Sequence, residues 1–156
     1  MKKIIALSAV TLLLGVAIAS AQVENPEKYI ELLRSDVSAD RVDILTEALE
    51  LTTAEGEAFW PIYRDYDLER AKLGDKSLAF IKKYGENYTS MSEDVAKDLI
   101  HEIADIQGDR IKLRKKTFDK AAKVIPAHKA ARFYQVDSAM DQIISLQIAS
   151  SLPLFK

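Results

Sequence analysis

Two histidines, His101 and His128, are the first candidates for a chemical role in this sequence. His101 lies four residues before Asp105, and on a helix this spacing places both side chains on one face, as a pair of metal ligands requires. A metal site needs further converging ligands, and the sequence offers no evident third one near this pair. We therefore interpret His101 as a solvated histidine in an acidic stretch, and we expect neither a metal nor a cofactor.

No other side chain stands in a recognisable catalytic setting. The chain has no cysteine, which excludes thiol chemistry. No serine or lysine lies in a setting that would activate it as a nucleophile. Paired carboxylates are frequent, but each pair lies in a charged stretch that a solvated helix face explains. We expect a protein that is not an enzyme.

The only tryptophan, Trp60, directly precedes Pro61 in the stretch LTTAEGEAFWPIYRDY, residues 51–66. The rest of this stretch has a helical pattern, and a proline inside a helix costs about 3 kcal/mol. Pro61 lies well past the first turn, so it removes the hydrogen bond to the Glu57 carbonyl and bends the helix. The pair therefore predicts a long helix that is bent near one end, and not an active-site loop.

The N-terminal segment has the layout of a secretory signal peptide. Two lysines precede an apolar run from Ile4 to Ala19, and Ala19-Ser20-Ala21 forms a small-residue cleavage site. The run is shorter than the roughly 20 residues that span a bilayer, which argues against a retained anchor. We expect cleavage after Ala21, and we expect residues 22–156 to form a single exported domain.

The exported chain is mildly acidic. Removal of Lys2 and Lys3 leaves 20 basic against 24 acidic side chains. Nucleic-acid binding requires clustered positive charge, so we expect no nucleic-acid partner. An exported compartment permits disulfides, but without cysteine the packing alone must hold the fold.

The pattern of apolar residues and caps predicts an all-α fold. Apolar side chains recur at helical spacing, and no stretch alternates in strand fashion. Caps and breaks divide the chain into helices from Pro26, after Ser38, over residues 53–87, over residues 93–125, and from Pro126 to near Pro153. The two longest helices would each extend roughly 50 Å. We expect an elongated hairpin of these two helices, flanked by shorter ones.

Two short motifs at the helix boundaries resemble those of a known family. Leu51-Thr52-Thr53-Ala54-Glu55 is similar to the LTxxQ motif of the Spy/CpxP family of periplasmic proteins, with Glu55 in place of glutamine. A second copy of the motif matches at Ile125-Pro126-Ala127-His128-Lys129, with Phe133 at the family's spacing. Here Pro126 replaces threonine and Lys129 replaces glutamine. Thr52 and Glu55 keep a reciprocal capping arrangement, whereas the second motif keeps only a proline at its helix start.

The resemblance implies a cradle-shaped, all-helical protein that forms a homodimer and holds unfolded client proteins without ATP. Some members of the family instead restrain a membrane sensor kinase of the envelope-stress response, and others bind metal. Our main hypothesis is a periplasmic, chaperone-like (holdase) protein. A regulatory adaptor or ligand of a membrane stress sensor, and a purely structural helical protein, remain alternatives.

Aromatic side chains on the helix over residues 53–87 are the candidates for client contact. Phe59, Tyr66, Leu73 and Phe80 recur every seven residues, and we predict that they form the buried seam of the hairpin. A ring with a polar tip suits a half-wet binding surface better. We therefore assign client binding to four other side chains: Trp60, Tyr63, Tyr84 and Tyr88.

The helix predicted over residues 93–125 separates its charges. Its first half, from Glu93 to Asp109, is acidic, and its second half, from Arg110 to Lys123, is basic. The helix dipole explains only the charges in the terminal turns. An antiparallel second copy would set the acidic half against the basic half and favour a homodimer, whereas a solvated charged face is an equally good interpretation.

Overall fold

The computed structural model describes residues 40–154, and of Ser151 only the backbone. The predicted signal peptide at 1–21, the predicted cleavage site after Ala21 and the helix predicted from Pro26 lie outside the described residues. The same holds for Ser38, the predicted cap of the second helix. The sequence-based expectations for these residues stay predictions.

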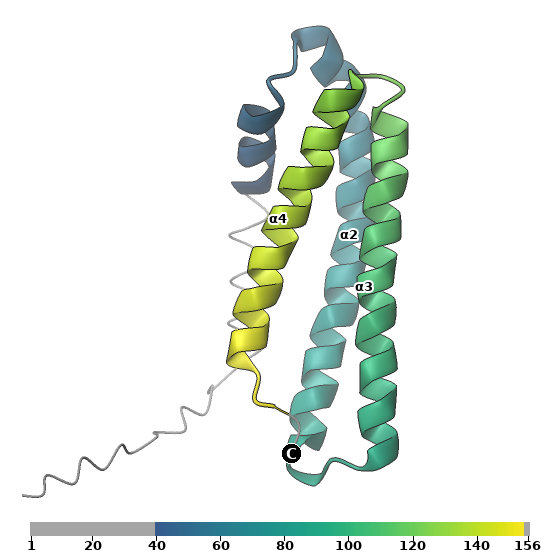
Figure 1. The fold of residues 1–156 in the computed structure, drawn as a ribbon, viewed down its shortest axis with the longest axis vertical. Helices are drawn as coiled ribbons and strands as arrows, with labels where there is room; N and C mark the ends of the chain where they lie inside the picture. Colours follow the sequence, from purple (N-terminus) through teal and green to yellow (C-terminus); the bar gives the residue numbers. More distant parts are fainter. Residues whose placement is uncertain (1–39, 155–156) are drawn as a thin grey trace, which may run out of the picture.

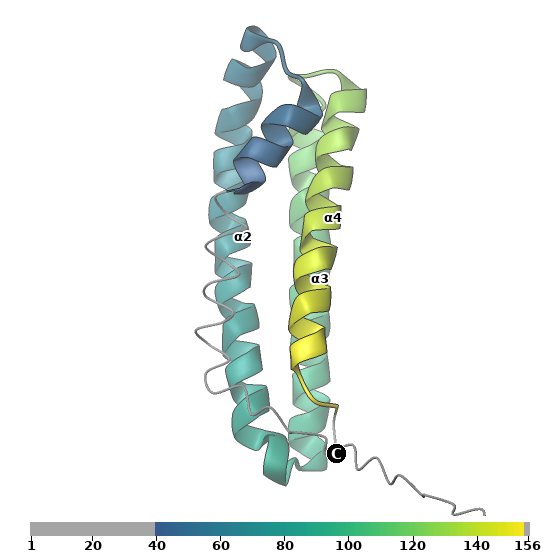
Figure 2. The same cartoon turned by 90° about the vertical axis from the view of Figure 1, so that its left-hand side faces the viewer.

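The described part of the chain is all-helical and contains no strand, which confirms the predicted fold class. The described residues begin inside a first helix, which is described from residue 40 and ends at Leu49; we call this part the 40–49 helix. It is followed by α2 (Thr53–Asn87), the short 3-10 helix η1 (Tyr88–Ser90), α3 (Glu93–Ala121) and α4 (Ala127–Ser151). Figure 1 shows α2 and α3 as an elongated antiparallel hairpin, with α4 returning beside them. The 40–49 helix lies on the outer side of the bundle in its upper half, in front of α2 and α4 in the view of Figure 2.

The caps fix the start of both long helices. The Thr52 side chain accepts a hydrogen bond from the Glu55 N–H at 3.3 Å, and the Glu55 carboxylate accepts one from the Thr52 N–H at 2.8 Å. This is the predicted capping box. The Ser92 hydroxyl caps α3 by accepting from the Val95 N–H at 3.3 Å. α2 therefore has the predicted bounds, and α3 starts where expected.

The predicted end of α3 at Ile125 is wrong, because the helix ends at Ala121. Residues 122–125 form a turn in which the N–H groups of Lys123 and Val124 bond three residues back, at 3.2 and 2.9 Å. Pro126 follows this turn, and a proline excludes the helical conformation for the residue before it. The chain must therefore leave α3 ahead of Ile125 before α4 can start.

Pro61 lies inside α2, and the helix continues through it without interruption. This excludes an irregular loop at the Trp60-Pro61 pair, and α2 is drawn as one continuous ribbon in Figure 2. The bend itself stays a prediction.

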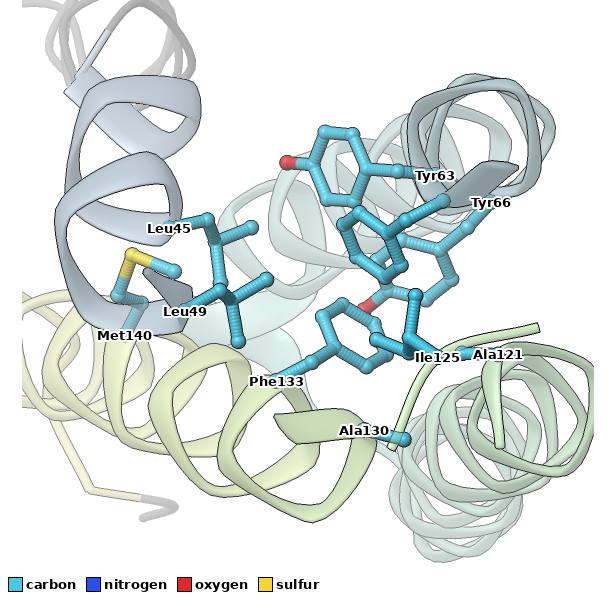
Figure 3. Close-up of a cluster of buried hydrophobic side chains, with 10 residues drawn as sticks. Leu45, Leu49, Tyr63, Tyr66, Ala121, Ile125, Ala130, Phe133 and Met140 are labelled. Atoms are coloured by element: carbon cyan, nitrogen blue, oxygen red, sulfur yellow. The ribbon is translucent and has the colours of Figure 1, made fainter. Parts of the chain in front are cut away.

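The core has two parts, one toward each end of the bundle. The upper cluster surrounds Phe133 and includes Leu45 and Leu49 of the 40–49 helix, and Figure 3 shows their side chains converging between the helices. The lower cluster contains Phe80, Ile81, Tyr84, Leu99 and Ile106. The predicted seam is confirmed, because all four of its members are buried: Phe59, Tyr66, Leu73 and Phe80.

Candidate functional site

The two boundary motifs meet at one end of the bundle. The Lys129 Nζ of α4 lies 2.7 Å from the Glu55 Oε2 of α2, and it donates to the Glu50 carbonyl oxygen at 2.7 Å. Hydrogen bonds from Lys129 and from the Thr52 backbone lower the pKa of the Glu55 carboxyl. The two residues that stand in place of the motif glutamines, Glu55 and Lys129, thus form an ion pair that joins α2 to α4.

The other motif residues are structural. Phe133 is fully buried, and its ring makes edge-on contacts with Phe59, Tyr63 and Tyr66 at centroid distances of 5.6, 6.2 and 5.5 Å. Ile125 is buried in the same cluster, and Leu51 packs half-buried against it. Pro126 is exposed and forms the N-cap of α4. The motifs therefore lock this end of the bundle.

A groove of about 560 Å³ lies beside this joint. Trp60 and Pro61 of α2 line it, together with the first turn of α2 and the end of the preceding segment. Its residues are Thr46, Glu50, Leu51, Thr52, Thr53, Gly56, Glu57, Trp60, Pro61 and Arg64. The groove combines an aromatic and an aliphatic wall with charged side chains, so it is suited to an extended segment with an apolar side chain.

Gly56 lines the groove next to the indole. A Cβ at this position would lie 3.4 Å from the Trp60 Nε1 and 3.5 Å from its Cδ1, which is ordinary van der Waals contact, so alanine would fit against the edge of the ring.

Of the four predicted client-binding residues, only Trp60 lies in the groove, where it is half-buried. The expectation that Tyr63 and Tyr84 are exposed is wrong, because both side chains are buried. Tyr63 packs edge-on against Trp60, and burial, followed by the charge of Asp67, raises its pKa to about 12. Tyr84 donates a hydrogen bond to the Pro153 carbonyl at 2.6 Å.

Tyr88 lies half-buried at the opposite end of the bundle, in η1, so the four residues do not form one surface. The separation follows from the length of α2, since Trp60 and Tyr88 lie near its two ends. Client contact by the pair would have to involve both ends of the bundle.

Both histidines are exposed. Among residues 40–154, no three side chains of the metal-ligating types lie together in a way that would hold a metal ion. Within the same residues, no helix has the length and apolar character needed to cross a membrane.

A buried polar cluster joins the 40–49 helix, α2, α3 and α4. Asp137 of α4 is fully buried and accepts from Arg41 at 2.6 Å, from the Arg114 Nε at 2.7 Å and from the Tyr66 hydroxyl. Asp141, one turn further along α4, accepts from Arg41 at 2.7 Å and also from Arg114. Two guanidinium groups therefore face two carboxylates in the interior. Together with Tyr66 they form what we call the polar cluster: Arg41, Tyr66, Arg114, Asp137 and Asp141.

The pKa shifts in the polar cluster keep Tyr66 neutral and Arg114 charged. Burial and the charge of Asp137 raise the pKa of Tyr66, so its hydroxyl stays neutral and donates. Burial opposes the charge of Arg114, but hydrogen bonding to Asp137 and the charge of that carboxylate outweigh it and raise the pKa. Both guanidinium groups are ion-paired with both carboxylates, although the Arg41 Nε has no acceptor among the described residues, so the cluster holds helices together.

The sequence pattern does not predict this cluster, and it places Arg114 in the basic half of α3, with the charged surface residues. The partners of Arg41 are 96 and 100 residues away in the sequence, so no local spacing indicates them. The only local signal is Asp137 and Asp141, two acidic residues four apart on a stripe of α4 that also carries Phe133 and Met140. A carboxylate pair on an apolar stripe indicates buried cationic partners.

The comparisons with known proteins find no matching family model, no matching curated protein and no matching solved structure for this chain.

Proposed function

We propose that this chain is an exported, periplasmic holdase that binds unfolded client segments without ATP. The observation that carries the proposal is the groove at the joint of the two motifs, with the half-buried indole of Trp60 in its wall. Two further points support it: the signal-peptide layout of residues 1–21, and the resemblance of the two motifs to the Spy/CpxP family.

The groove has the composition that client binding requires. A large indole with one N–H donor binds many different apolar side chains without demanding a particular sequence. Glu50, Glu57 and Arg64 carry charges of both signs around it, which suits the polar backbone of an extended segment. Aromatic anchors in a partly desolvated recess dominate binding energy in protein interfaces.

The sole tryptophan makes a direct test possible. A tryptophan-free, chemically unfolded client protein should shift the emission of Trp60 on binding, and the mature chain should suppress aggregation of that client without nucleotide. Trp60→Ala should reduce suppression, whereas Leu68→Ala, which removes a 66% exposed apolar side chain outside the groove, should not. Equal suppression by both variants, or an unchanged emission, would reject the groove as the client site.

The test also separates the alternatives. An adaptor or ligand of a membrane stress sensor would leave aggregation unaffected and would bind one membrane protein. A purely structural helical protein would do neither.

We further propose that two copies form a cradle-shaped homodimer through α3. Ile100 and Ile111 on α3 are 53% and 56% exposed, which leaves an apolar strip on the same helix as the exposed acidic and basic residues. Antiparallel pairing of two copies would cover this strip and set Asp98, Glu102 and Asp105 against Lys112, Lys115 and Lys116.

Analytical ultracentrifugation at two salt concentrations tests the dimer. Lys112→Glu, Lys115→Glu and Lys116→Glu together should weaken it, and less so at high salt, because the screening length falls from about 10 Å at 0.1 M to about 3 Å at 1 M. Reversal of Asp98, Glu102 and Asp105 to lysine in the same chain should restore it. A monomeric wild type, or a dimer whose affinity is unchanged by the charge reversal, would contradict this interface.

A further inference from the structure

A second cavity, of about 170 Å³, lies between α2, α3 and α4 in the half of the bundle away from the motif joint. Phe80, Ile81 and Ile106 are buried and form part of its wall, and Ile103, Ile148 and Leu152 add apolar surface. Ser77, Gln107, Arg110 and Ser145 supply its polar groups. A water molecule needs roughly 10–15 Å³ of cavity, so this space admits a ligand with several apolar atoms.

Arg110 is the only charged side chain in this wall, and no ion pair joins it to a described carboxylate, although the charge of Asp141 acts on it from a distance. Its Nη2 donates to the Ser77 Oγ at 2.9 Å, and its Nε is buried without a hydrogen-bond acceptor among the described residues. No carboxylate of the described residues forms an ion pair with it, in contrast to Arg41 and Arg114. Burial, with a smaller contribution from the charges of Arg70 and Arg41, lowers its pKa and outweighs the opposing charge of Asp141.

A guanidinium at an apolar cavity, with a buried Nε that has no acceptor and without an ion pair, has a definite chemical preference. Unpaired buried charge is unfavourable, and a planar guanidinium binds a carboxylate through two parallel N–H bonds. An alkyl chain attached to that carboxylate would occupy the space lined by isoleucine and phenylalanine side chains. One molecule would thus satisfy the charge and fill the cavity.

We propose that this cavity binds a single-chain carboxylate amphiphile of the fatty-acid class, with its head group on Arg110 and its alkyl chain between α2, α3 and α4. The site is independent of the client groove, which lies at the other end of the bundle (Figure 1). It gives the protein a small-molecule ligand in addition to its proposed clients.

Octanoate, 1-octanol and acetate are suitable probes, with binding followed by calorimetry and by the methyl NMR signals of Ile103, Ile106 and Ile148. Octanoate should bind and shift these signals, acetate should not bind, and 1-octanol should bind at least tenfold more weakly than octanoate. Arg110→Met should weaken octanoate at least tenfold and leave 1-octanol unchanged. Lys97→Met, which removes a 67% exposed lysine from the same helix, is the matched control and should bind octanoate like the wild type.

A second variant, Ala149→Phe, tests the site independently in case Arg110→Met does not fold. Ala149 is exposed at the cavity wall, so Ala149→Phe should fill the cavity from the solvent side and abolish binding of both octyl ligands. Trp60→Ala should leave octanoate affinity unchanged, which separates this site from the client groove. Absence of octanoate binding to the wild type, or an equal loss in Arg110→Met and Lys97→Met, would overturn the proposal.

Discussion

Replacement of Asp137 by alanine should be among the most destabilising single changes in this chain. It removes the acceptor of three hydrogen bonds, from Arg41, Arg114 and Tyr66, at a position with no solvent exposure. Asp141 keeps one bond to each guanidinium, so one positive charge in the interior loses its countercharge. Breaking a buried ion pair in this way costs about 3–5 kcal/mol.

Urea titration followed by Trp60 emission and by circular dichroism measures this loss. With a slope of about 2 kcal/mol per M, the unfolding midpoint should fall by roughly 1.5–2.5 M. Asp119→Ala removes a half-exposed carboxylate that pairs with Lys115 at 2.8 Å on α3, and it should leave the midpoint unchanged. A loss of about 1 kcal/mol or less in Asp137→Ala, typical of a surface pair, would refute the reasoning.

Three further predictions concern backbone and side-chain positions away from the polar cluster. Pro61→Ala should raise the unfolding free energy by up to about 3 kcal/mol in the same titration, because residue 61 regains its hydrogen bond to Glu57; a loss would contradict this. Above about pH 10 and until about pH 12, Tyr63 should contribute a fall in stability of about 1.4 kcal/mol per pH unit, because folded Tyr63 keeps a proton that the unfolded chain has lost; Tyr63→Phe should remove this share of the slope and leave that of Tyr66 and Tyr84, whose pKa values are also raised. Glu50 has a φ of 47°, so Glu50→Gly should raise the melting point by relieving about 1 kcal/mol of left-handed strain, and an unchanged or lower melting point would reject this.

Caps and the spacing of apolar residues predicted the helices well, whereas contacts between helices could not be predicted from the sequence. Thr52 and Glu55 fix the start of α2 and lie only three residues apart, so this boundary can be predicted from the sequence. The heptad count identified one buried row of α2 but placed Tyr63 outside it. This was wrong because the upper half of α2 contacts several helices at once, so its buried arc is wider than one seam.

The same difference between local and long-range information applies to the candidate sites. The motif residues could be identified from their spacing, but the ion pair between Glu55 and Lys129 joins positions 74 residues apart. The shape of the groove depends on the path of the segment before Thr52, which lines it together with Trp60. The spacing of apolar residues does not predict this path. The cavity beside Arg110 depends on where three helices pack less closely, and this too is a property of the assembled bundle.

The position of the polar cluster indicates what it contributes beyond stability. Arg41, Leu45 and Leu49 lie four residues apart on the 40–49 helix, and all three are fully buried. The two leucines alone would tolerate a shift of this short helix by one turn, because an apolar contact has no strong preference for register. Arg41 does not tolerate it, since only one register places its guanidinium between Asp137 and Asp141. A buried ion pair adds little net stability over an apolar contact, but it penalises every misaligned packing by several kcal/mol. We therefore infer that the cluster selects the register in which the 40–49 helix docks, and with it the path of residues 50–52 beside the groove. Arg41→Met should then cost less stability than Asp137→Ala but give several sets of NMR signals for Leu45 and Leu49, and a single sharp set would contradict this role.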